Sequence, residues 1–161
     1  MPHYPEATRG HMTVISAGPP GQETISRDWP AEAGMCTTPP MLLVKSEREG
    51  TGGTLVLLAL PDNKVTSYPV TTVNRGLPVP PAAQVGVQLF SQAGSQAFQA
   101  TEGSAEVYSF GKTVSGRFAV TLREINRNER VQYAGAFREV PVTQLDPKLC
   151  APAAGGASPA K

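Results

Sequence analysis

The chain has 161 residues, of which 40% are hydrophobic, and a formal net charge of +1. This length predicts one domain around one apolar core, and the near-neutral charge predicts no overall attraction to nucleic acid or acidic lipid. The longest apolar run, residues 55–60, is far too short to cross a bilayer, so we expect no transmembrane segment. Sixteen glycines and 16 prolines favour a loop-rich, all-β domain.

The first 40 residues are scattered with proline and glycine and show no sustained periodicity, which predicts a loosely ordered N-terminal segment. Both histidines, His3 and His11, belong to this segment. We therefore expect the folded region to contain neither a His-based nucleophile nor a His-rich metal site. The sequence also lacks a CxxC pair, a phosphate-binding glycine loop and a calcium loop, so no cofactor is expected.

Residues 41–150 are predicted to form the domain. Short strand-like runs follow one another at 41–46, 54–60, 65–70, 84–90 and 96–101. The run at 54–60 is nearly continuously apolar, which is typical of a strand buried on both faces or of a strand in a tight sandwich core. Tyr68-Pro69 indicates an edge strand. The proline-rich stretch 71–83 predicts an extended crossing between two sheets.

The clearest strand pattern lies between residues 103 and 142. In the run 113–123, apolar and polar residues alternate, which predicts one face in the core and one face in water. The predicted core-facing residues there are Val114, Gly116, Phe118, Val120 and Leu122, followed in the next run by Val131, Tyr133, Gly135 and Phe137. The alternation then slips at Arg138–Glu139, which predicts a β-bulge.

Glycines within this stretch have two expected roles. Gly111-Lys112 fits a tight hairpin turn. Gly116 and Gly135 lie at core-facing positions, where we expect them to make room for neighbouring aromatic rings. About eight strands at ten-residue spacing, without a convincing helix, predict an antiparallel β-sandwich, immunoglobulin-like or related. The alternative is a closed, calycin-like β-barrel. Residues 151–161 form a small-residue tail that we expect to be disordered.

The two cysteines, Cys36 and Cys150, bracket almost all of the strand-like sequence. A disulfide between them would close a loop of more than a hundred residues and stabilise the fold by about 4–5 kcal/mol in the chain-entropy model. The alternative is a pair of free thiols. A disulfide would indicate an oxidising compartment, so we expect a periplasmic or secreted protein, although the start of the chain shows no charged segment followed by an apolar run.

Three arginines are the candidate binding residues. Arg117, Arg123 and Arg138 share the outward parity of adjacent strands and could together hold a polyanion. Glutamates interleave with them, and cross-strand ion pairs on a solvated face explain the same residues. Because the aromatic residues are expected to face inward, nucleic acid is not expected as a partner. No acidic pair, among Asp62, Glu102 and Glu106, has a spacing that singles it out for catalysis.

Several short motifs resemble a known kind of domain. They are Tyr68-Pro69-Val70, Phe98-Gln99, Gly103-Ser104-Ala105-Glu106-Val107, Val114-Ser115-Gly116-Arg117-Phe118 and Gly135-Ala136-Phe137. Together they are similar to small exported β-sandwich domains of unknown function in Gram-negative bacteria, often carried on lipoproteins. The resemblance covers about half of the chain; it implies a β-sandwich and an extracytoplasmic location and supplies no catalytic residues.

These observations predict a non-enzymatic, extracytoplasmic β-sandwich that acts as a binding or structural module of the cell envelope. Its partner would be an envelope protein or a glycan. The second hypothesis is a calycin-like barrel that holds a small apolar ligand. The third is a carboxylate-based hydrolase.

Overall fold

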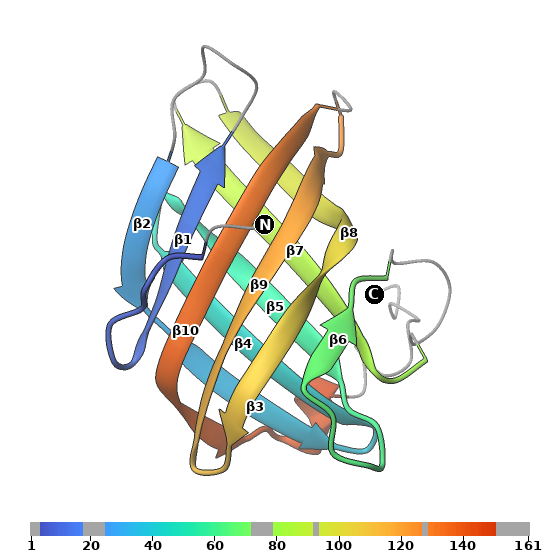
Figure 1. Cartoon of the computed structure of the whole chain (residues 1–161). Coiled ribbons are helices and arrows are strands. Elements are labelled where there is room, and N and C mark those ends of the chain that lie inside the picture. Colours follow the sequence, from blue (N-terminus) through green and yellow to red (C-terminus); the bar gives the residue numbers. More distant parts are fainter. Residues whose placement is uncertain (1–3, 18–24, 72–78, 92–93, 127–128, 151–161) are drawn as a thin grey trace.

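The computed structural model describes residues 4–17, 25–71, 79–91, 94–126 and 129–150. These residues form ten strands (Figure 1). Their bounds are β1 (His11–Ala17), β2 (Ile25–Pro30), β3 (Glu32–Thr37), β4 (Pro40–Arg48), β5 (Gly52–Ala59), β6 (Ser67–Pro69), β7 (Ala82–Ser91), β8 (Gly94–Phe110), β9 (Thr113–Glu124) and β10 (Arg130–Gln144). The predicted all-β class is confirmed.

All ten strands belong to one sheet, and the strand pairing returns on itself as a ring. Antiparallel pairs link β3, β4, β5, β7, β8, β9 and β10 in that order, and β10 then pairs with β3 in parallel. The strands β1 and β2 extend from β10, and the short β6 extends from β8. In Figure 1, β9 and β10 cross in front of β3, β4 and β5. Two walls thus face one another across one core, as the layers of a sandwich do, while hydrogen-bonded ladders join them.

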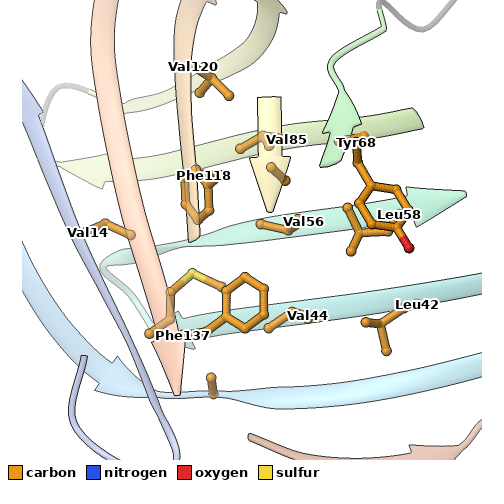
Figure 2. Packing of buried hydrophobic residues seen from close by; sticks show 14 of the residues in the cluster. Val14, Leu42, Val44, Val56, Leu58, Tyr68, Val85, Phe118, Val120 and Phe137 are labelled. Atoms are coloured by element: carbon orange, nitrogen blue, oxygen red, sulfur yellow. The ribbon is translucent and has the colours of Figure 1, made fainter. Parts of the chain in front are cut away.

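The core is built from the alternation that the sequence predicts. Phe118 and Phe137 are completely buried, and Figure 2 shows them near Val44 and Val56 of the opposite wall. The glycines directly across the ladder leave room for these rings: a Cβ on Gly135 would lie 2.4 Å from Phe118 Cζ, and one on Gly116 would lie 2.8 Å from Phe137 Cζ. The space-making role predicted for both glycines is confirmed.

The bulge predicted at Arg138–Glu139 is also confirmed. The register between β9 and β10 shifts between Phe137 and Val140, and Glu139 has a φ of 46°. Farther along β10, Pro141 falls between the residues that pair with β1 and those that pair with β3. A proline has no N–H to donate to a neighbouring strand. It is tolerated at this position because neither β1 nor β3 pairs with it there.

The N-terminal segment differs from the prediction. Residues that we expected to be loosely ordered form β1, β2 and β3, and the buried side chains of Met12 and Val14 on β1 join the main core. These strands are only six or seven residues long and lie in a stretch interrupted by prolines and glycines, so their periodicity is not sustained. They exist because β1 pairs with β10 and β3 pairs with β4 and β10, contacts that no local pattern reveals. The predicted tail 151–161 lies outside the described residues.

Two strand assignments are also revised. The runs 96–101 and 103–110 form one strand, β8, with a bulge between Ala100 and Glu102. The apolar run in β5 is not buried on both faces: Val56 and Leu58 enter the core, whereas the side chain of Leu55 points outward and is 40% exposed. The predicted edge at Tyr68-Pro69 is confirmed, because among the strands that the structure describes β6 pairs with β8 alone. Most of the predicted proline-rich crossing lies outside the described residues.

The predicted disulfide is present between Cys36 and Cys150. Beyond β10 the chain crosses the outer face of β3, where Leu145 fills the space beside Gly34, and residues 147–150 form one helical turn. The half-buried side chains of Leu43, Leu57 and Leu145 pack around the disulfide. The C-terminal segment therefore covers one end of the outer face of β3, β4 and β5. Among the described residues, no helix has the length and hydropathy needed to cross a membrane.

Candidate functional site

Two β-bulges flank the same point of β9. On one side, Val107 pairs with Gly116 and Ser109 pairs with Ser115, so Tyr108 is the extra residue of β8. On the other side, the bulge of β10 places Glu139 beside Ser115, whose hydroxyl accepts a hydrogen bond from the Glu139 N–H at 2.8 Å. Bulges concentrate next to binding sites because they re-aim side chains. The region around Ser115 is therefore the candidate site.

Tyr108 points outward at the bulge in β8 and is 58% exposed. Arg117 lies beside it on β9, with the guanidinium carbon 5.5 Å from the centre of the Tyr108 ring and 4.0 Å from the centre of the Tyr4 ring. Arg117 Nε donates a hydrogen bond to Glu106 Oε1 at 2.7 Å. These four residues, Tyr4, Glu106, Tyr108 and Arg117, are called the Arg117 cluster below.

The electrostatics of this cluster follow from its contacts. The hydrogen bond that Arg117 donates to Glu106 raises the pKa of Arg117, so the guanidinium stays charged. Partial burial raises the pKa of Tyr108, and Glu106 and Tyr4 add to this effect while Arg117 opposes it. Tyr108 therefore keeps its proton under physiological conditions. The result is a neutral, exposed ring whose position is supported by a cation that is itself held by a carboxylate.

A pocket of about 240 Å³ lies next to Tyr108. Its walls are the connection 60–66 between β5 and β6 and the end of β8 at 107–110, held together by a hydrogen bond from the Val107 N–H to the Thr66 carbonyl oxygen at 2.8 Å. The residues of this β6 pocket combine aromatic and hydrogen-bonding side chains; among them are Asp62, Asn63, Lys64, Tyr108, Ser109 and Phe110. Within the described residues, neither Asp62 nor Lys64 has an ion-pair partner. The pocket thus offers free polar groups beside an aromatic ring.

The three arginines predicted to bind a polyanion lie in different surroundings. Arg117 is engaged by Glu106, and Arg138 Nε lies 3.5 Å from Glu139 Oε2. Arg123 lies six residues from Arg117 along β9, a separation of about 20 Å. The structure therefore brings Arg117 and Arg138 near the two bulges and leaves Arg123 apart. Of the three, Arg117 makes a cross-strand ion pair of the expected kind, with Glu106, whereas Arg138 contacts the glutamate that follows it in the chain.

Sequence reasoning missed the role of Tyr108. Tyr108 follows the buried Val107 in an alternating run, so parity does suggest an outward ring, but no local signal shows that a bulge displaces it toward Arg117. Tyr4 was missed because it belongs to the segment expected to be loosely ordered. Tyr108 reaches Arg117 through the pairing of β8 with β9, and Tyr4 reaches it from the irregular segment that precedes β1.

A second polar cluster corrects the prediction that the folded region lacks histidine. His11 begins β1, and its Nδ1 lies 2.9 Å from Asp28 Oδ1 on β2. The Asp28 carboxylate also accepts hydrogen bonds from the hydroxyls of Thr8 and Thr13, each at 3.0 Å. Burial raises the pKa of Asp28, but these three hydrogen bonds and the charge of His11 outweigh it, so the pKa lies below its ordinary value.

No group of three or more His, Cys, Asp or Glu side chains within the described part of the chain is arranged to hold a metal ion. Comparison with protein-family models, with curated proteins and with solved structures finds no match to this chain. The Arg117 cluster and the β6 pocket together form the candidate binding site.

Proposed function

We propose that this protein is a non-catalytic binding module outside the cytoplasm and that it recognises a glycan of the cell envelope. The observation that carries the proposal is the position of Tyr108: the ring points outward at a bulge of β8, Arg117 lies beside it, and the β6 pocket opens next to it. The disulfide between Cys36 and Cys150 supports the extracytoplasmic location, because such bonds persist in oxidising compartments.

The chemistry of a sugar ring matches this arrangement. One face of a pyranose presents C–H groups with partial positive charge, which are attracted to the electron-rich face of an aromatic ring. Its hydroxyls both donate and accept hydrogen bonds, so they suit a carboxylate, an amide and an ammonium group, which Asp62, Asn63 and Lys64 provide. A volume of about 240 Å³ suits one sugar unit, with the rest of a chain extending into solvent.

The other two hypotheses have less support. A small apolar ligand would need space inside the ring of strands, yet Phe118, Phe137 and Met12 fill the interior. A carboxylate-based hydrolase would need two facing acidic groups. Glu106 is held by Arg117, and Asp62 lies in the β6 pocket without a described acidic neighbour among its lining residues.

The test is a titration of the ¹⁵N-labelled protein with soluble oligosaccharides prepared from the bacterial envelope, peptidoglycan fragments and lipopolysaccharide core among them. We expect chemical-shift changes at residues 60–66 and 107–110. Tyr108→Ala should abolish binding, because it removes the stacking surface. Phe90→Ala is the matched control, since Phe90 is an exposed aromatic residue outside the pocket, 44% exposed. Binding that survives Tyr108→Ala, or no binding by any of these oligosaccharides, would contradict the proposal.

The location is tested separately. Intact cells are treated with a membrane-impermeant protease, and the protein is followed with and without disruption of the outer membrane. An extracytoplasmic protein is degraded without lysis of the inner membrane, whereas a cytoplasmic control protein is protected. Protection of this protein together with the control would contradict the proposed location.

A further inference from the structure

The segment that precedes β1 brings a side chain to the candidate site. Residues 4–10, called the N-terminal strap below, turn back at Gly10, which has a φ of 77°, and lead toward β10 (Figure 1). Glycine suits this turn because it adopts a positive φ without a steric cost. The strap thereby carries the half-buried Tyr4 to Arg117 on β9, a residue far along the chain.

Backbone and side-chain contacts tie the strap to the bulge of β10. The Gly10 N–H donates a hydrogen bond to the Arg138 carbonyl oxygen at 2.6 Å, and Arg9 Nε lies 3.0 Å from Glu139 Oε2. Glu139 has a φ of 46°, a conformation that costs energy for a residue with a side chain and that clusters at binding sites. The two bulges beside β9 thus have different tasks, because one presents Tyr108 and the other anchors the strap.

Arg117 is held by neighbours from two separate parts of the chain. Its Nε donates a hydrogen bond at 2.7 Å to Glu106, the residue directly across the ladder on β8. Its guanidinium carbon lies 4.0 Å from the centre of the Tyr4 ring, which is a cation–π contact. A free arginine side chain samples many rotamers, and ordering it costs entropy. Glu106 and Tyr4 together therefore restrict Arg117 to one position.

Tyr108 depends on a neighbour for its own position. As the extra residue of the β8 bulge it has no opposite residue on β9, and its side chain is 58% exposed. The guanidinium carbon of Arg117 lies 5.5 Å from the centre of its ring. An exposed ring that has to be ordered when a ligand stacks on it binds more weakly than a ring that is already in place. Arg117 therefore has to be in place if Tyr108 is to be pre-ordered.

We infer that Tyr4 is a positioning residue of the glycan site: it holds Arg117 beside Tyr108 and thereby fixes the Tyr108 ring before a sugar binds. The inference rests on the proposed function, in which Tyr108 is the stacking surface. The contact with Arg117 is made by the Tyr4 ring, so a phenylalanine at this position should preserve it. The N-terminal strap is then a working part of the binding module.

NMR spectra of the free protein test the positioning without a ligand. The Tyr4 ring should shift the signal of Arg117 Hε upfield. Tyr4→Ala should remove this shift and increase the motion of the Tyr108 ring, measured by ¹³C relaxation, whereas Tyr4→Phe should match the wild type in both. Phe90→Ala is the control, because Phe90 is an exposed ring (44%) on β7, outside the Arg117 cluster. An unchanged Arg117 signal in Tyr4→Ala, or a Tyr108 ring that stays equally ordered, would overturn the inference.

A variant at the anchor of the strap tests the same contact from a distance. Arg9→Ala removes the ion pair with Glu139 and should move the Arg117 signal part of the way toward its position in Tyr4→Ala. Lys45→Ala is the matched control, because Lys45 is likewise an exposed cation beside glutamates, on β4. An Arg117 signal that responds equally to both variants would contradict the role of the strap.

Titration with the envelope oligosaccharides separates this inference from the proposed function. Tyr4→Ala should weaken binding about three- to tenfold, the cost of ordering one more side chain, and Tyr4→Phe should bind as the wild type does. Equal affinity in Tyr4→Ala and the wild type would overturn the inference. So would a loss as complete as in Tyr108→Ala, because Tyr4 would then be a stacking surface itself. If the wild type binds none of them, the proposed function fails, and the order of the Tyr108 ring in the free protein decides whether Tyr4 positions it.

Discussion

The ring of Phe118 occupies the space above Gly135, directly across the β9–β10 ladder. Two residues along the ladder, Phe137 takes the same position over Gly116. Each of the two strands thus supplies a phenylalanine ring that occupies the space left by a glycine of the other strand. This arrangement places two completely buried phenylalanines at the centre of the core without pushing the strands apart.

Substitution of Gly135 by alanine should destabilise the protein by about 1–3 kcal/mol, because an added Cβ would lie 2.4 Å from Phe118 Cζ and force the ring to move. The measurement is equilibrium unfolding in urea. Gly111→Ala is the control, since a Cβ at Gly111 meets no atom within 4 Å. If both variants unfold at the same denaturant concentration as the wild type, the close fit at Gly135 does not exist.

Replacing both cysteines by serine should lower the free energy of unfolding by about 4–5 kcal/mol, because the disulfide closes a sequence separation of 114 residues. Urea unfolding of the wild type and the double variant measures the difference. The wild-type protein should react with a thiol-alkylating reagent only after reduction, and mass spectrometry detects the adducts. Alkylation of the folded, unreduced protein would show that the bond does not form.

Tyr133 should ionise later than the other tyrosines. Burial raises the pKa of Tyr133 to about 12, although its hydrogen bond with the Thr54 hydroxyl opposes this shift. The unfolded chain ionises this residue near pH 10, so its contribution to stability is complete below that pH and declines as the pH rises toward 12. An alkaline titration of tyrosinate absorbance should show this late step, and Tyr133→Phe should remove it. An unchanged titration curve in the variant would refute the assignment.

Asp28 should make folding sensitive to acid. Its pKa lies below the ordinary value because hydrogen bonds from Thr8, His11 and Thr13 outweigh the effect of burial. The stabilisation is therefore complete above the pKa of the unfolded chain, about 4, and is lost as the pH falls through the lower pKa of the folded state. Urea unfolding as a function of pH should show a smaller acid-dependent loss in Asp28→Asn than in the wild type. Parallel pH profiles would contradict this account.

The part of the fold that could be predicted is the part whose signal is local. Alternation in 113–123 identified the buried residues of β9, and the slip at Arg138–Glu139 identified the bulge of β10. Both signals come from the two-residue period of a strand, which a sequence displays directly. The strands β1, β2 and β3 gave no such signal, because they depend on partners far along the chain.

The candidate site, too, could be predicted from the sequence only in part. Arg117 was a predicted binding residue, yet its neighbours Tyr4 and Tyr108 come from a segment before β1 and from the paired strand β8, and neither contact can be read from the local sequence. His11 was assigned to an unstructured segment and instead contacts Asp28 within paired strands. Distances between side chains on different strands depend on register, and register is a property of the assembled sheet.

The sequence by itself determined the all-β class and the inward-facing residues of the last two long strands, because the two-residue period of a strand is visible without knowledge of its neighbours. It left the two cysteines either bonded or free, and the structure decided for the bond. Only the tertiary structure decided that the strands pair in a ring, that Tyr108 stands beside Arg117 and an open pocket, and that Leu55 remains bare on the outer face. These features arise where segments distant in sequence come into contact. The free energy that stabilises such contacts is spread over many residues, and the local sequence around each of them shows no pattern.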